Sequence, residues 1–323
     1  MDFHHYKLKR GQNGQCGVMI FKHCVRWLGQ YFDGIIEKFF SKANLEKYEP
    51  GLWFSMLKNM LSKTKDYFID VIRINAYSKK LALVLIIRSF ILPLHILDFR
   101  KFVIKLDSYF LRISLENTKI IKNNLQFFLK DVESFIILRN NTEKWIYEHL
   151  TPKKGEVFVD VGAHIGKYTI EMAKLVGPAG RVFAFEADPD NFNLLKRNVK
   201  INNLNNVSTY NIVAWNSESK ILFHKGDSSG HGSVKGSQKF GYYTLESKPL
   251  DHILYGTKVN WIKIDVEGAE YEVLEGLSQT LETCRPKLIV EIFEKNQEKV
   301  FNLMSKFGYK WKEISKQNFL FYT

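Results

Sequence analysis

The sequence has little cysteine. Cys16, Cys24 and Cys284 are the three cysteines in 323 residues, and they form no C-x-x-C pair. Structural zinc sites and disulfide frameworks need such pairs or a larger even set, so we expect neither. Few cysteines also fit a reduced cytoplasmic setting. Residues 1–5 lack the basic-then-apolar pattern of a secretory signal peptide, which favours the same location.

Long apolar runs are also lacking. The longest, residues 81–97, contains Arg88 and has Pro93 near its end, whereas a membrane-spanning helix needs about 20 apolar residues with few charges. We do not expect a spanning helix there. Two interpretations stay open for this run: a buried helix in a small bundle, or a peripheral helix in the lipid boundary with nearby lysines and arginines on anionic headgroups.

Residues 1–115 contain no motif for a known chemistry. Apolar residues recur there at helical spacing, as in residues 18–40 and 52–74, which predicts a mostly helical N-terminal region of unknown role. Positive charge is concentrated in the first part of the chain. Residues 1–150 hold 24 Lys and Arg against 14 Asp and Glu, and residues 151–323 hold 23 against 20. Such an excess can indicate nucleic-acid binding, but no nucleic-acid-binding motif accompanies it, so we expect no nucleic-acid partner.

A missing glycine is informative in residues 157–188. An apolar stretch ends in the turn Asp160-x-Gly162-x-His164-x-Gly166, and a helical stretch and a second apolar stretch follow. This order predicts a strand, a tight turn, a helix and a second strand, with a ligand at the turn. A dinucleotide site needs a glycine where His164 stands, because the backbone must approach the pyrophosphate closely.

Two acidic residues indicate a different ligand. Asp160 would repel a phosphate but suits a ligand with a cationic amino-acid end. Glu186 lies 20 residues after Gly166, where it can accept hydrogen bonds from both hydroxyls of a ribose. Two carboxylates, a ribose and no phosphate indicate S-adenosylmethionine. The alternative is an ordinary tight turn in a doubly wound domain.

A second acidic group follows the apolar stretch 259–264. Asp265, Glu267 and Glu270 crowd the end of a predicted strand, where like charges repel one another. Such a cluster suits the orientation or deprotonation of an acceptor hydroxyl. A divalent-cation site is the second interpretation, but we cannot pick out further ligands and therefore assign no metal-binding residue. Glu270 alone could simply stabilise the start of the helix predicted for residues 270–283.

The remaining segments are read from spacing and turn residues. Residues 116–141 predict a strand-rich connector, and residues 142–150 a short helix capped by Thr142. Residues 207–213 predict a third strand, and the end of the chain predicts a hairpin of residues 309–314 and 319–322. Between the third strand and residue 259 lies an excursion of about 40 residues, longer than loops usually run without a role. Its glycine- and serine-rich loop, residues 226–233, suits either a substrate-facing loop or a surface hairpin.

From about residue 142 to 323 the chain resembles the FkbM family of S-adenosylmethionine-dependent methyltransferases. The resemblance implies an α/β class I methyltransferase fold: a mixed sheet of seven strands, one of them antiparallel, with helices on both faces. It also implies methyl transfer, commonly to a hydroxyl oxygen. Two positions depart from the family pattern: His164 stands where Asn is frequent, and Phe293 where His is frequent. The matching residues are 159–166, 185–189 with Asn198, 250–251, 262–270 and 285–291.

The resemblance, taken with the residues, assigns roles in this sequence. Asp160, Gly162, His164 and Gly166 would hold the methionine part of the cofactor and Glu186 its ribose, while Asp188, Asn211 and Trp215 would flank the adenosine. Asp265 and Glu267 would act on the acceptor. We expect a small molecule or glycan as acceptor, including glycolipids, and a cytoplasmic enzyme with possible peripheral membrane contact through residues 1–115. The rival classes are a non-catalytic protein of the same fold and a nucleic-acid-directed enzyme tethered by its basic N-terminal region.

Overall fold

The computed structural model describes residues 117–138, 143–226, 228–236 and 238–323. The predictions for residues 1–115 and for a cap at Thr142 lie outside these ranges. In the part of the chain that the structure describes, no helix is both long and apolar enough to span a bilayer.

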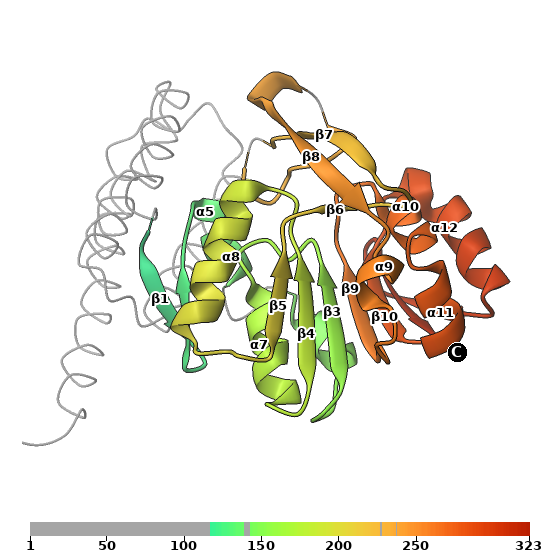
Figure 1. The fold of residues 1–323 in the computed structure, drawn as a ribbon, viewed down its shortest axis with the longest axis horizontal. Helices are drawn as coiled ribbons and strands as arrows, with labels where there is room; N and C mark the ends of the chain where they lie inside the picture. Colours follow the sequence, from blue (N-terminus) through green and yellow to red (C-terminus); the bar gives the residue numbers. More distant parts are fainter. Residues whose placement is uncertain (1–116, 139–142, 227, 237) are drawn as a thin grey trace, which may run out of the picture. The chain divides into compact units, whose positions relative to one another are not determined.

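A seven-stranded mixed sheet forms the centre of the fold, in the order β11-β12-β10-β9-β3-β4-β5. β12 is antiparallel to both of its neighbours, and every other neighbouring pair is parallel. The seven-stranded sheet with one antiparallel strand, predicted from the resemblance, is therefore confirmed (Figure 1). The strands are β3 (Val157–Val161), β4 (Arg181–Phe185), β5 (Val207–Tyr210), β9 (Trp261–Ile264), β10 (Lys287–Glu291), β11 (Lys310–Ser315) and β12 (Asn318–Tyr322).

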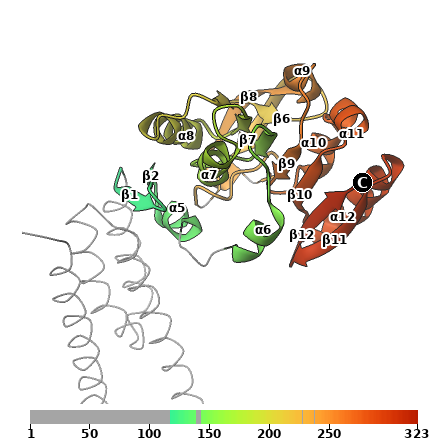
Figure 2. The same ribbon diagram turned by 90° about the horizontal axis from the view of Figure 1, so that it is seen from below.

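Helices cover both faces of this sheet, as expected (Figure 1 and Figure 2). Successive residues of a strand point to opposite faces. Val159 and Ile262 accordingly pack with the helices α9 to α12, while Phe158 and Trp261 pack with α6 and α7. The central strands are apolar on both sides because both sides are covered. The helices are α6 (Lys144–His149), α7 (Lys167–Val176), α8 (Pro189–Ile201), α9 (Asp251–Leu254), α10 (Glu270–Glu275), α11 (Ser278–Cys284) and α12 (Glu294–Lys306).

Two predicted elements are interrupted in the structure. The strand predicted for residues 207–213 ends at Tyr210, and the chain leaves the main sheet to form β6 (Val213–Ala214). The helix predicted for residues 270–283 is split at Gly276. A Cβ atom on Gly276 would lie 2.1 Å from the main-chain oxygen of Trp215, so two backbones meet there.

The excursion after β5 folds as a small sheet of its own. β6, β7 (Ser219–His224) and β8 (Tyr242–Lys248) pair in the order β6-β8-β7, with the short helix η2 (Gln238–Phe240) before β8. This sheet lies beyond the carboxyl ends of β3, β4 and β5 (Figure 1). The loop that joins β7 to β8 is thereby placed at the edge of the main sheet where α/β proteins bind ligands.

The segment predicted as a strand-rich connector is half strand and half helix. β1 (Lys119–Lys122) and β2 (Leu125–Phe128) form a hairpin, and α5 (Val132–Ile137) follows because Asp131 and Ser134 form a capping box. Fully buried Asn198 of α8 holds this segment in place. Its side chain accepts from the N–H of Phe128 at 2.7 Å and donates to the carbonyl of Ile165 at 2.9 Å.

We predict that Asn198→Ala lowers the free energy of unfolding by about 2–4 kcal/mol, because it leaves several buried main-chain groups without partners. Lys200→Ala, on the exposed side of the same helix, should change it by less than about 0.5 kcal/mol. Urea unfolding measures both values. Equal stabilities for the two variants would show that Asn198 does not hold the hairpin.

Candidate functional site

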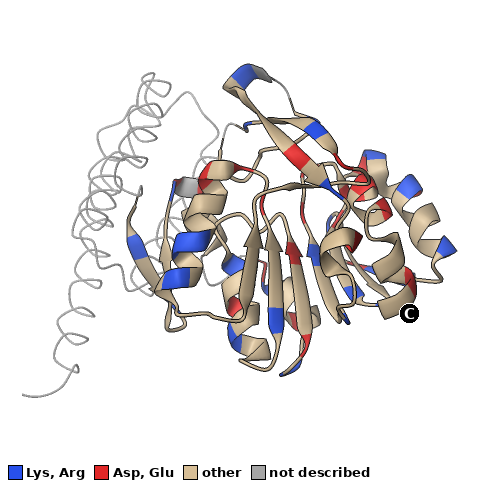
Figure 3. Cartoon of the chain, viewed as in Figure 1, with Lys and Arg blue, Asp and Glu red and all other residues tan. Residues whose placement is uncertain are grey.

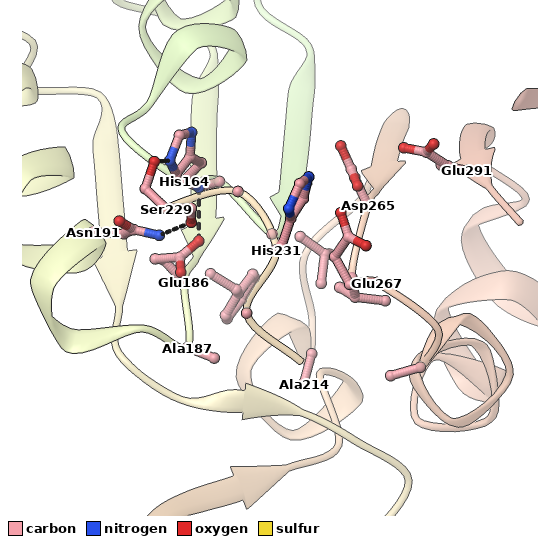
Figure 4. A pocket seen from close by; sticks show the side chains of 18 of the residues that line it. His164, Glu186, Ala187, Asn191, Ala214, Ser229, His231, Asp265, Glu267 and Glu291 are labelled. Carbon is pink, nitrogen blue, oxygen red and sulfur yellow. Dashed lines mark hydrogen bonds between the residues drawn. The ribbon is translucent and has the colours of Figure 1, made fainter. Parts of the chain in front are cut away.

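A cavity lies where β3, β4, β9 and β10 end, and Figure 4 shows its two halves. His164, Glu186, Asn191 and Ser229 surround one half, which we call the turn half. Asp265, Glu267 and Glu291 surround the other, which we call the acid half. His231 lies between the two halves (Figure 4).

The glycine after β3 joins the two halves. Gly162 has a φ of 81°, and a Cβ atom built on it would lie 1.8 Å from the main-chain oxygen of Asp265. The ends of β3 and β9 therefore touch backbone to backbone, and a side chain at residue 162 cannot fit. Gly166, with a φ of 92°, ends the same turn directly before α7.

Glu186 is the central acidic group of the turn half. It follows β4, and its carboxylate accepts from the N–H of His164 at 2.7 Å and of Asp188 at 2.9 Å. Burial raises the pKa of Glu186 to about 7, although both of these hydrogen bonds act in the opposite direction. A carboxylate oxygen accepts more than one hydrogen bond, so Glu186 can also accept from hydroxyls of a ligand in the cavity.

Asp160 is not among the residues that line the cavity and is 1% exposed. One of its carboxylate oxygens accepts from the hydroxyl of Thr169 at 2.6 Å, and the other has no hydrogen-bond partner among the described residues. Burial raises its pKa, while the charge of Lys263 acts against this. A buried acceptor without a partner points to a donor outside the protein chain, such as a water molecule or the amino group of a ligand.

Asp265 and Lys263 form an ion pair in the acid half. The Nζ of Lys263 lies 3.0 Å from the carboxylate of Asp265, and the lysine side chain is 5% exposed. Burial disfavours both charges, but their mutual attraction outweighs it, so the pKa of Lys263 is raised and that of Asp265 is lowered. Asp265 is therefore ionised and fixed in position.

Glu267 and Glu291 hold their protons more tightly. Burial and the charge of Asp265 raise the pKa of Glu267 to about 7 and that of Glu291 to about 8. Glu291 is thus mostly protonated at neutral pH and can donate its hydrogen bond to Asp265. Glu267 has a φ of 53°, a left-handed conformation that is unusual without glycine. Such conformations often mark functional sites.

Glu270 differs from the other acidic residues of this cluster. It is fully buried, and it accepts from the N–H of Gly268 and from the side chain of Asn296, both at 2.6 Å. These bonds tie the turn after β9 to α12. Glu270 is therefore a structural residue of the turn.

The loop between β7 and β8 is fastened to the turn half through Ser229. Its hydroxyl donates to Asp131 at 2.9 Å and lies 2.8 Å from the Nε2 of His164. Asn191 donates to the carbonyl of Ser229 at 2.8 Å. Burial lowers the pKa of His164 to about 4, so its ring is neutral. Because the serine proton goes to Asp131, the Nε2 of His164 must carry the proton that it donates to Ser229.

The structure brings five of the predicted site residues to the cavity: Gly162, His164, Glu186, Asp265 and Glu267. The other five lie outside its lining. Asp188 caps α8 through the N–H groups of Asp190 and Asn191. Asn211 donates to the carbonyls of Glu186 and Ala187. The predicted site residues that do not line the cavity are thus Asp160, Gly166, Asp188, Asn211 and Trp215. Their contact with a ligand stays a prediction.

Several residues that line the cavity were not predicted as site residues. Lys263 and Glu291 could have been found from the sequence, because each is a charged residue in or at the end of an apolar strand. The others come from separate elements whose meeting no local pattern indicates. They include Glu133, Glu143, Asn191, Ser229 and His231. No group of three or more His, Cys, Asp or Glu side chains within the described ranges is arranged to hold a metal ion.

Comparison with known proteins gives consistent matches. Residues 160–311 match the model of the methyltransferase FkbM domain. "Methyltransferase 1" of Beauveria bassiana is 28% identical over 158 residues, or 42% of this chain and 63% of that protein. "Hexuronic acid methyltransferase AglP" of Haloferax volcanii is 31% identical over 143 residues, or 43% of this chain and 57% of that protein. The chain thus spans about 57% to 63% of the length of these curated relatives.

Among solved structures, a methyltransferase FkbM from Methylobacillus flagellatus is similar with a TM-score of 0.41 and 18% identity. The match covers 54% of this chain and 45% of that one.

We predict that Gly162→Ala lowers the free energy of unfolding by about 3 kcal/mol or more, because its methyl group would collide with the backbone after β9. Gly155→Ala is the matched control. Gly155 also has a positive φ, but nothing lies within 4 Å of the added Cβ, so we expect only the strain of about 1–2 kcal/mol. Thermal unfolding of both variants compares the two costs, and equal losses would contradict the close approach.

Proposed function

We propose that this protein, whose residues 160–311 match the model of the methyltransferase FkbM domain, is an S-adenosylmethionine-dependent methyltransferase. We further propose that it acts on a hydroxyl oxygen of a sugar, glycolipid or metabolite. The observation that carries this proposal is that the Glu186 carboxylate and the cluster of Asp265, Glu267 and Glu291 line one and the same cavity. The cofactor, when bound, supplies a methyl group activated by a sulfonium.

The turn half fits S-adenosylmethionine. Glu186 can accept hydrogen bonds from the two ribose hydroxyls, and Gly162 and His164 of the turn line the same cavity. The carboxyl oxygen of Asp160 that has no partner among the described residues can accept a hydrogen bond from the amino group of a ligand. No lysine or arginine of the described residues hydrogen-bonds Glu186 in place of a ligand.

The acid half fits an acceptor with hydroxyl groups. Asp265 is ionised and Glu291 donates its one proton to Asp265, so the remaining carboxyl oxygens of both residues can accept from hydroxyls. Several acceptors side by side suit a polyol, whose hydroxyls can each donate. The relative AglP is named for a hexuronic acid substrate, which supports a sugar acceptor for this chain.

We predict that cofactor affinity depends on the ionisation of Glu186. Only the ionised carboxylate accepts from both ribose hydroxyls, and its pKa in the free protein is raised to about 7. The Kd for S-adenosylmethionine should therefore be constant above that pH and rise as pH falls below it, towards tenfold per pH unit. Calorimetry between pH 5.5 and 8.5 measures this dependence.

Glu186→Gln should weaken cofactor binding by about 1.5–3 kcal/mol and remove most of the pH dependence. Glu282→Gln, an exposed change on α11, should leave both unchanged. A wild-type Kd and pH profile in Glu186→Gln would exclude the ribose assignment.

We predict that Asp265→Asn lowers turnover by about 10²–10⁴-fold, because it removes the charged acceptor that orients the substrate hydroxyl. The Kd for S-adenosylmethionine should change by less than about threefold, since Asp265 does not lie in the turn half. Transfer of a radiolabelled methyl group to glucose, glucuronic acid or N-acetylglucosamine measures turnover. Full activity of Asp265→Asn on a substrate of the wild type would contradict this role.

A further inference from the structure

The loop between β7 and β8 is attached to both halves of the cavity. Ser229 is fastened to Asp131, His164 and Asn191 in the turn half. Ser233 donates from its hydroxyl to the main-chain carbonyl of Glu267 in the acid half, at 2.7 Å. The loop therefore crosses from one half to the other, and its two attachments are four residues apart.

His231 is the residue midway between these attachments. It lines the cavity, and Figure 4 shows its ring between the two halves, beside Asp265 and Glu267. The residue is also exposed to solvent, so a proton taken up by its ring can leave to water. When charged, the ring lowers the pKa of Glu267.

Asp265 and Glu291 are less suited to take a proton from the acceptor, whereas the pKa of the third neighbouring acid, Glu267, is raised to about 7. Asp265 is paired with Lys263, and its lowered pKa makes it a weak base. Glu291 already holds a proton near neutral pH. An imidazole has an ordinary pKa of about 6.5, which is close to the value that suits a general base in neutral solution.

We propose that His231 is the general base of the methyl transfer and that Glu267 orients its imidazole. This assignment rests on the proposed function. The acceptor O–H bond breaks and its proton passes to a ring nitrogen of His231. The acceptor oxygen forms a bond to the methyl carbon as the carbon–sulfur bond breaks, and that electron pair stays on sulfur. Glu267 stabilises the imidazolium until His231 releases the proton to water.

The first test compares His231→Asn with His252→Asn, using the monosaccharide of the panel that the wild type methylates fastest. His252 lies on α9, where its ring contacts the side chain of Glu218, and neither residue lines the cavity. We expect kcat to fall by about 10²–10⁴-fold in His231→Asn, the cofactor Kd to stay within about threefold, and His252→Asn to match the wild type. Added imidazole should restore part of the turnover of His231→Ala.

The second test needs no acceptor and follows the histidine ring protons by NMR as pH is varied. His231→Asn identifies the signal of His231. Charged residues around this part of the cavity are Glu133, Lys263, Asp265, Glu267 and Glu291. Glu267→Gln should lower the pKa of His231 by about 1, because a neighbouring negative charge is removed. The control is Glu272→Gln. Glu272 accepts from Lys235 of the same loop, and its substitution should leave the pKa of His231 unchanged.

Three results would overturn the assignment. They are turnover of His231→Asn within threefold of the wild type, a loss of turnover matched by an equal loss of cofactor affinity, and an equal pKa of His231 in the wild type and Glu267→Gln. The second would mean that His231 only holds the loop. Failure of the proposed function looks different, because the wild type itself would then not bind S-adenosylmethionine.

Discussion

The contact between the ends of β3 and β9 is the constraint on which the site depends. The missing side chain of Gly162 lets the main-chain oxygen of Asp265 lie where a Cβ atom would be. The turn after β3 carries His164, whose N–H donates to Glu186 after β4, and the turn after β9 carries Asp265 and Glu267. Because the two turns touch, the proposed cofactor over one would lie beside the proposed acceptor over the other. Proximity of the two reactants is the main contribution that a protein can make to methyl transfer.

Charge at this edge of the sheet is unbalanced, and the imbalance sets the state of each group. Acidic residues gather around α10 and the strand ends beside it (Figure 3). Lys263 forms its ion pair with Asp265, whereas burial and the charge of Asp265 raise the pKa values of the neighbouring Glu267 and Glu291. Carboxyl groups with different environments can accept, donate and orient within one small cavity. The loop that carries His231 lines this cavity between the two halves, because Ser229 is fastened to Asp131 and Ser233 to the carbonyl of Glu267.

The sequence was sufficient to predict what is local. The apolar strands β3, β4 and β9, the turn at Gly162, the acids Glu186 and Asp265 and the closing hairpin of β11 and β12 each leave a continuous pattern in the chain. Contacts between distant segments leave no such pattern. Asp131 meets Ser229 across 98 residues, and α5 forms where alternation predicted strand because a capping box starts it. Residue type and spacing also do not predict that Asp188 caps α8 and that Asn211 donates to the carbonyls of Glu186 and Ala187.

The central claim is that the turn half of the cavity takes S-adenosylmethionine. Calorimetry of the full chain against S-adenosylhomocysteine and, separately, NAD tests it most directly, since both ligands carry an adenosine and one carries a pyrophosphate. Binding of one equivalent of S-adenosylhomocysteine, with no measurable heat from NAD, is the predicted result. Binding of NAD without S-adenosylhomocysteine, or of neither ligand, would contradict the account.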